Sequence, residues 1–82
     1  MRVQLMYFAS LRDLIQLSAE DYELPAEVRS VEALLSHLPE RHPALTGKLG
    51  SVRVAVNESF VSTDTPLNAN DVVALIPPVA GG

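Results

Sequence analysis

The residues with the clearest chemical potential are the last six of the sequence, Pro77-Pro78-Val79-Ala80-Gly81-Gly82. Since glycine has no Cβ, Gly81 and Gly82 could carry a terminal carboxylate into a channel too narrow for other residues. Pro77 and Pro78 resist helix formation and favour an extended backbone, so six residues reach at most roughly 20 Å. The run predicts a stiff spacer with a slim reactive tip, and a ragged end without function is the alternative.

The other side chains do not show a catalytic or metal-binding pattern. The chain has no cysteine, which excludes disulfides, thiolate-rich metal sites and cysteine nucleophiles. His37 and His42 are expected to be solvated or to cap helices, and no metal ligands are predicted. Any catalytic side chains would therefore have to come from partner proteins.

Size and charge limit the possible partners. A chain of 82 residues is expected to form one small domain, and its net charge of −4 disfavours nucleic acid and anionic membranes as partners. No apolar run approaches the roughly 18 residues of a membrane span. Because no signal peptide is recognisable either, the cytoplasm is the expected location.

The first half of the chain predicts two strands and two helices. Residues 2–9 alternate, with Val3, Leu5 and Tyr7 on one face, and residues 21–24 form a weaker strand that could pair back on them. The spacing of Ser10 and Asp13 predicts a capped helical turn over residues 11–16. Ser30 should cap a longer helix that ends or kinks at Pro39. Its apolar stripe, with Leu35 expected at the centre of the core, is Val31, Leu34, Leu35 and Leu38.

The second half predicts an irregular connection up to Gly50 and then three strands. Residues 52–56 alternate, residues 57–58 form a turn, and residues 60–61 and 72–76 are strands. Val73 and Leu75 should face the helix. The fold class is therefore α+β, a mixed sheet of four to five strands packed on one main helix, with a domain over residues 1–76 and a projecting tail over 77–82.

Several apolar residues remain outside this core. Met6, Phe8, Phe60 and Ile76 should point away from the helix, on the opposite face of the sheet. A contiguous exposed apolar patch is more often a partner site than an accident. We therefore expect a partner-binding surface at the root of the tail.

The order of these elements resembles the β-grasp, or ubiquitin-like, fold ending in Gly-Gly. More closely, it resembles the sulfur-carrying small subunits of molybdopterin synthase. The most specific motif is the strand Asn70-Asp71-Val72-Val73-Ala74 running into the Pro-Pro-Val-Ala-Gly-Gly end. Other matching stretches are residues 3–9, 11–14, 30–34, 54–57 and 66–67. Pro39, inside the main helix of that family, is a departure that leaves the end of the helix open.

The resemblance implies a mechanism in molybdenum cofactor biosynthesis. An adenylyltransferase related to ubiquitin-activating enzymes would use ATP to convert Gly82 to an acyl-adenylate, and sulfur transfer would then give a thiocarboxylate. The tail would deliver this sulfur to a pterin precursor inside the large synthase subunit, within a heteromer, expected to be a heterotetramer. No cofactor would be bound by the chain itself. The implied partner contacts are the tail together with Phe60, Ile76, Phe8, Met6 and Arg12.

Three other functions stay open at the level of sequence. The first is sulfur transfer for thiamine thiazole synthesis or tRNA thiolation, which uses the same chemistry with another acceptor. The second is a ubiquitin-like protein modifier, whose Gly82 would form isopeptide bonds with lysines. The third is an interaction module whose tail is inert.

Overall fold

The computed structural model describes residues 1–78, which form a five-stranded mixed sheet, two α-helices and one short 3-10 helix. The strands are β1 (Arg2–Tyr7), β2 (Ala19–Glu23), β3 (Arg53–Val56), β4 (Ser59–Val61) and β5 (Val72–Ile76). The helices are α1 (Ala9–Ile15), α2 (Val31–Arg41) and the 3-10 helix η1 (Pro43–Leu45). The predicted α+β class and the order of the elements are confirmed.

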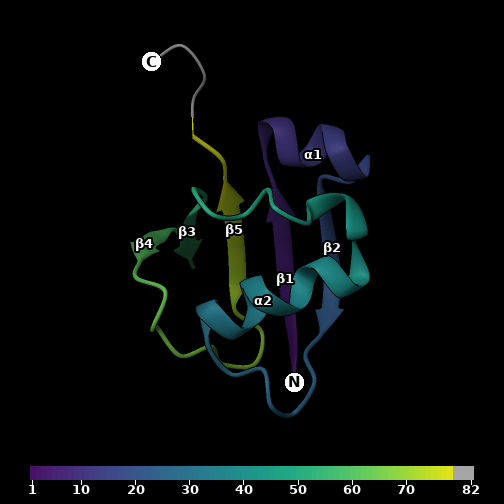
Figure 1. Cartoon of the computed structure of the whole chain (residues 1–82). Coiled ribbons are helices and arrows are strands. Elements are labelled where there is room, and N and C mark those ends of the chain that lie inside the picture. Colours follow the sequence, from purple (N-terminus) through teal and green to yellow (C-terminus); the bar gives the residue numbers. More distant parts are fainter. Residues whose placement is uncertain (79–82) are drawn as a thin grey trace.

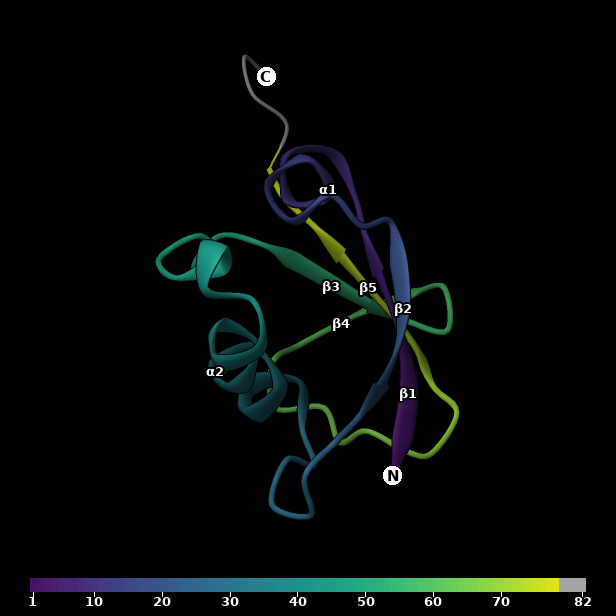
Figure 2. The ribbon, with the colours of Figure 1, turned by 90° about the vertical axis from the view of Figure 1, so that its right-hand side faces the viewer.

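The sheet is arranged around the last strand of the sequence. Its strands lie in the order β2-β1-β5-β3-β4, and β1 and β5 are parallel whereas the other pairs are antiparallel. Figure 1 shows β5 in the middle of the sheet with α2 in front of it. Figure 2 shows α2 on one side of the sheet, and within residues 1–78 no helix covers the other face. We call these the inner and the outer face.

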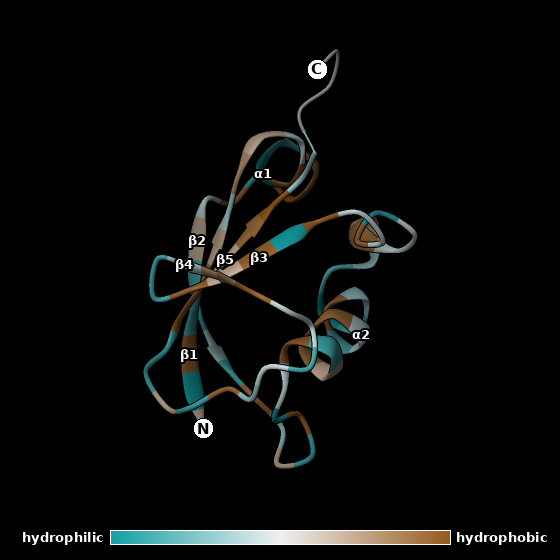
Figure 3. Cartoon of the chain, turned by 90° about the vertical axis from the view of Figure 1, so that its left-hand side faces the viewer, coloured by the Kyte–Doolittle hydropathy of each residue, from teal (hydrophilic) through white to brown (hydrophobic). Residues whose placement is uncertain are grey.

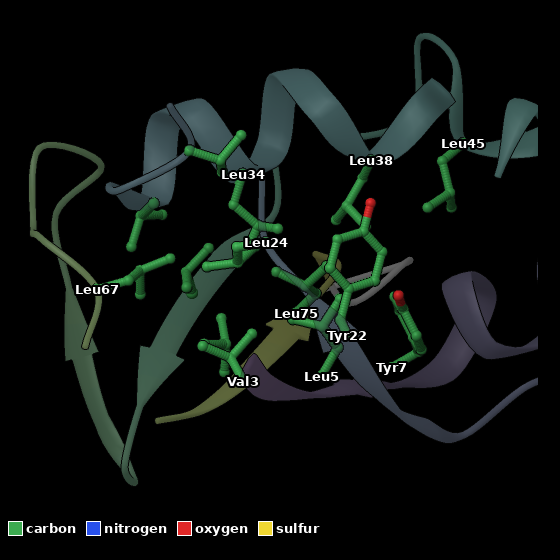
Figure 4. Packing of buried hydrophobic residues seen from close by; sticks show 14 of the residues in the cluster. Val3, Leu5, Tyr7, Tyr22, Leu24, Leu34, Leu38, Leu45, Leu67 and Leu75 are labelled. Carbon is green, nitrogen blue, oxygen red and sulfur yellow. The ribbon is translucent and has the colours of Figure 1, made fainter. Parts of the chain in front are cut away.

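One hydrophobic core fills the space between α2 and the inner face. Val3, Leu5 and Tyr7 are at most 1% exposed, and Val73 and Leu75 are fully buried, as the alternation predicts. Figure 4 shows leucines of α2 directed toward these strands, and Figure 3 shows the banded hydropathy of an amphipathic helix. The other core residues are Leu11, Tyr22, Leu24, Val28, Val31, Leu34, Leu38, Leu45, Val54 and Leu67.

The start of α1 differs from the prediction. The helix begins at Ala9 with Phe8 as its N-cap and without a side-chain cap, so the predicted capping by Ser10 is wrong. The amide groups of Leu11 and Arg12 both donate to the carbonyl oxygen of Phe8, which moves the first turn two residues toward the N-terminus. Ser10 therefore lies inside the helix, where its side chain cannot reach the free amide groups of the first turn.

The main helix confirms its predicted start and extends past its predicted end. The Ser30 side chain accepts a hydrogen bond of 3.1 Å from the Ala33 amide, as an N-cap does. The helix nevertheless continues through Pro39 to Arg41, so the expected stop is wrong. Proline removes its own amide donor and crowds the carbonyl four residues before it, but the His42 amide still closes the last turn on the Leu38 carbonyl at 2.8 Å.

Two predictions for the core also need correction. Leu35 is only partly buried, at the edge of the core, whereas Leu34 and Leu38 are completely buried. Leu35 is therefore not at the centre of the core. The connection after α2, expected to be irregular, contains η1 and buries Leu45 completely.

At the predicted turn after β3, Asn57 and Glu58 have φ angles of 51° and 72°, which suit a tight hairpin.

Candidate tail root and partner-binding face

The root of the C-terminal run is packed against the body of the protein. Pro77 is buried and Pro78 is exposed, so the burial alternation of β5 continues one residue past the strand. The two prolines have no amide hydrogen, and the sheet ladder therefore cannot extend beyond Ile76. A shallow pocket surrounds this root, lined by Ser10, Leu11, Leu14, Gly47, Lys48, Gly50, Ser51, Pro77 and Pro78.

The predicted reactive tip falls beyond this root. Val79, Ala80, Gly81 and Gly82 lie outside the described residues, so the role of the Gly82 carboxylate stays a prediction. The division into a domain over residues 1–76 and a tail over 77–82 also stays a prediction. The structure does define the strand, the two prolines and the pocket from which the last four residues start.

The outer face of the sheet carries an apolar row that crosses all five strands. The register pairs Met6 with both Ala19 and Ala74, and it pairs Ala55 with both Ala74 and Phe60. Neighbouring residues in such a row have Cβ atoms about 5 Å apart and can be covered by one partner. We call this set the outer row. Between Met6 and Phe60 the row consists of the small residues Ala74 and Ala55, and Ala19 lies on the other side of Met6.

Arg53 links Phe60 to Ile76, the residue directly before the tail root. Phe60 is 55% exposed, and the Arg53 guanidinium carbon lies 4.0 Å from the centre of its ring. Arg53 is also the Cα partner of Ile76, the residue before Pro77. The predicted outward residues on β1, β4 and β5 therefore lie on one face, as expected. Their function in binding stays a prediction.

The other two expected partner contacts lie beside this face. Phe8 directly follows β1, caps α1 and is 38% exposed. Arg12 lies on α1, and its side chain, 55% exposed, approaches Asp13 at 3.8 Å. An exposed pair of neighbouring residues at this distance contributes little stability, so Arg12 is available to a partner.

Three residues of this surface, Arg53, Ala55 and Ala74, were not among the partner contacts expected from the sequence. Their signal was present, because they alternate with the inward-facing Val54, Val73 and Leu75. A search for large exposed apolar residues does not select small or charged ones. The strand register shows their place, because it puts Ala55 beside both Ala74 and Phe60.

A buried polar contact fixes the start of β5. Asp71, 8% exposed, accepts hydrogen bonds from the Asn57 side chain at 2.9 Å and from the Asn68 amide at 2.8 Å. Asn57 in turn accepts a bond from the Val72 amide at 3.0 Å. A slip by one residue would exchange the two faces of the strand. This contact therefore helps to set which residues of β5 face outward.

A second polar cluster joins the end of α2 to the sheet. The Tyr7 hydroxyl donates to Glu20 at 2.6 Å, and His42 Nε2 lies 2.7 Å from the same carboxylate oxygen. Burial, followed by this bond to Glu20, raises the pKa of Tyr7 well above its ordinary value. Of the two roles expected for His42, the capping role is confirmed, because it is the C-cap residue of α2, whereas its side chain is largely enclosed rather than solvated.

The described part of the chain shows neither a metal cluster nor a membrane helix. No group of three histidine, aspartate or glutamate side chains within residues 1–78 could hold a metal ion. None of the helices in this part is long and apolar enough to cross a membrane.

The chain has close relatives along its whole length. The ThiS family matches residues 5–82. The chain belongs to the ThiS family. A curated relative is the molybdopterin synthase sulfur carrier subunit of Escherichia coli K12, 38% identical over 98% of this chain and 99% of that protein. The human protein of the same name is 27% identical over 99% of this chain and 94% of that protein.

Solved structures agree with this member of the ThiS family in fold. A putative molybdopterin converting factor subunit 1 from Pyrococcus furiosus is 34% identical with a TM-score of 0.80, covering 95% of this chain and 98% of that chain. A protein from Helicobacter pylori, solved as a complex of subunits 1 and 2 of molybdopterin-converting factor, has 25% identity and a TM-score of 0.69, with both chains fully covered. The β-grasp, ubiquitin-like fold and the resemblance to molybdopterin synthase small subunits are confirmed.

Proposed function

We propose that this chain is the sulfur carrier subunit of a molybdopterin synthase. The observation that carries the proposal is the match to the Escherichia coli sulfur carrier subunit over nearly the full length of both proteins. The ThiS match reaches Gly82, and the subunit 1 and 2 complex from Helicobacter pylori supports a large subunit as partner. The outer row is the surface that we assign to this partner, in a heterotetramer in the cytoplasm.

The proposed chemistry takes place at Gly82 in three steps. An adenylyltransferase related to ubiquitin-activating enzymes joins the carboxylate to AMP from ATP and releases pyrophosphate. Sulfide-level sulfur from a donor then attacks the acyl carbon and AMP leaves, so that Gly82 carries a thiocarboxylate. Its sulfur passes to the pterin precursor in the large subunit, and water restores the Gly82 carboxylate. Since an ionised carboxylate is a poor electrophile, the acyl-adenylate is needed to make this carbon reactive. The nucleotide is held by the activating enzyme, and the chain itself needs no cofactor.

The body of the protein contributes position rather than catalysis. Pro77 is buried and lines a pocket together with residues of α1 and residues 47–51, and β5 before it is bonded to β1 and β3. A tail that starts from a fixed root reaches the reacting group with little loss of entropy, and misplacement by about 1 Å can cost roughly a hundredfold in rate. This explains why a whole domain is needed to carry two glycines.

The decisive experiment measures the product on Gly82. The chain is co-expressed with an activating adenylyltransferase and a sulfur source, and its intact mass is determined. We expect one oxygen to be replaced by sulfur, and no replacement in a variant that lacks Gly82. Pyrophosphate exchange should be lost in that variant, or with a residue added after Gly82, while the melting temperature stays unchanged. Full exchange activity in the extended protein, with its extension intact, would remove the basis of the proposal.

The acceptor is tested separately from the sulfur loading. The loaded chain is mixed with the large synthase subunit and a cyclic pterin precursor, and formation of the dithiolene is followed. Loading without transfer would point to a thiazole or tRNA acceptor instead. Isopeptide-linked conjugates in cells, detected by blotting, would indicate a protein modifier.

A further inference from the structure

The segments around the tail root differ in charge from the rest of the chain. Helix α1, residues 46–53 and residues 75–78 together contain three basic side chains and one acidic side chain, Asp13. The whole chain has 6 basic and 10 acidic residues, so the remainder holds three basic and nine acidic ones. The root therefore has two excess positive charges, while the remainder has six excess negative charges.

Each of the three basic residues belongs to a segment beside the tail root. Lys48 lines the same pocket as Pro77. Arg53 is the Cα partner of Ile76, directly before that proline. Arg12 lies on α1, next to the pocket-lining Leu11. We call Arg12, Lys48 and Arg53 the basic collar. In Figure 1 this end of β5 is opposite to the N-terminus of the chain.

The charges of the basic collar are not neutralised by strong ion pairs. Within residues 1–78, neither Lys48 nor Arg53 forms an ion pair, and Arg12 has only its distant contact with Asp13. In contrast, Arg41 pairs with the largely enclosed Glu20 at 3.4 Å. Exposed charges of one sign that gather at one end leave a local positive potential, which a surface of opposite sign can use.

We propose that the basic collar binds a carboxylate-rich rim on the large synthase subunit, around the opening that receives residues 79–82. The inference rests on the proposed function. Arg53 joins the collar to the outer row, because its guanidinium group stacks on Phe60. A small acidic rim fits better than nucleic acid or an anionic membrane, because the acidic remainder of the chain repels an extended polyanion.

Such a collar acts mainly on the rate of association. Complementary charges at the rim of an interface steer the approach of two proteins and fix their register, while apolar contacts dominate the lifetime of the complex. At physiological salt the charges act over about 8 Å, so only groups close to the opening contribute. The collar would thus orient the tail toward the opening before the outer row makes contact.

The test compares association rates in two salt concentrations. The variant Arg12→Gln/Lys48→Gln/Arg53→Gln and the natural chain are mixed with the large subunit in a stopped-flow instrument. At low salt we expect the association rate constant to fall about tenfold in the variant, with a much smaller change in the dissociation rate. At high salt the two proteins should associate at nearly equal rates, because screening removes the effect.

Single variants separate the position of a charge from the overall charge. A tenfold loss shared by three charges is about twofold for each, so Lys48→Gln alone should lower the association rate about twofold. Arg29→Gln also removes one exposed cation, at the opposite end where Arg29 lines a depression with Met1, and should leave the association rate unchanged. Arg53→Lys keeps the charge but loses the planar guanidinium stack on Phe60, so it should keep the salt dependence. Melting temperatures confirm that each variant is folded.

The outcomes distinguish this inference from the proposed function. If the natural chain binds the large subunit and the triple variant associates equally fast at low salt, the collar is refuted while the function stands. Equal losses in Arg29→Gln and Lys48→Gln would also refute it, because overall charge would then explain the effect. If the natural chain neither binds the large subunit nor acquires sulfur, the proposed function and the collar fall together.

Discussion

Phe60 gives the sharpest test of the outer row as a binding surface. It lies at one end of the row, on the edge strand β4, and its ring is 55% exposed. A large apolar side chain in this position contributes little to the stability of the isolated protein but presents a large apolar area to a partner. We expect Phe60→Ala to weaken binding to the large synthase subunit while the domain stays folded.

The exposed fraction sets the size of the effect. A phenylalanine side chain has about 200 Å² of surface, so the exposed 55% of Phe60 offers roughly 110 Å² to a partner. At about 25 cal/mol per Å², its burial contributes about 2.7 kcal/mol, which is close to a hundredfold in Kd. The isolated domain should lose only about 1 kcal/mol, mainly from the stack with Arg53.

The assay is a calorimetric titration of the large subunit at physiological salt, with a melting curve for each variant. Phe60→Leu is the matched control, because it keeps most of the apolar area and should lose much less affinity than Phe60→Ala. Natural affinity in Phe60→Ala would show that the outer row is not the interface. A collapse of the melting transition would show instead that Phe60 belongs to the core.

Two further predictions concern the body of the domain. Leu34→Ala should lower the free energy of unfolding by about 2–5 kcal/mol because Leu34 is completely buried, whereas Leu35→Ala at the edge of the core should cost clearly less. Denaturant titrations of both variants measure these losses, and equal losses would contradict the assignment of Leu34 to the centre of the core. Burial and the bond to Glu20 raise the pKa of Tyr7 above the ordinary 10.0, so the stability contributed by its retained proton is complete below that pH and is lost as the pH rises above it. Burial raises the pKa of Tyr22 in the same direction, so Tyr7→Phe should reduce the alkaline loss of stability without abolishing it, and an unchanged pH profile would argue against the enclosed phenol.

Much of the fold could be predicted because the local patterns are strong. The alternation of Val3, Leu5 and Tyr7 specifies both a strand and its buried face, and Ser30 followed by an apolar stripe specifies the start of a helix. In β5 the inward Val73 and Leu75 were assigned correctly for the same reason. These signals depend only on neighbours in sequence, so they can be detected without knowledge of the fold.

The errors lie where backbone hydrogen bonds and packing, rather than the spacing of residue types, decide. Ser10 has the right spacing for a cap, but the carbonyl of Phe8, directly after β1, already accepts the first amide groups of α1. Pro39 is tolerated because the buried Leu38 and the His42 amide hold the last turn in place. Leu45 is enclosed by elements on both sides, and no local periodicity shows this in a three-residue helix.

The site was predictable in part for the same physical reason. The outward direction of Met6, Phe60 and Ile76 follows from alternation alone. Their arrangement depends on the sheet order, which places β5 between β1 and β3 although the three are far apart in sequence. Lys48 joins the tail root only through the path of the chain after η1, so the basic collar could not be recognised from spacing.

The central position of β5 connects the partner surface with the tail. Its inward residues Val73 and Leu75 are fully buried in the core, while Ala74 and Ile76 between and after them belong to the outer face. A partner that binds the outer face therefore contacts the same strand that leads into Pro77. Because β5 is bonded along both edges and tied at its start by Asp71, it has little freedom to shift when the tail is engaged. A partner bound to the outer face therefore has the start of the tail at a fixed place relative to itself. A carrier of a terminal reactive group requires this property.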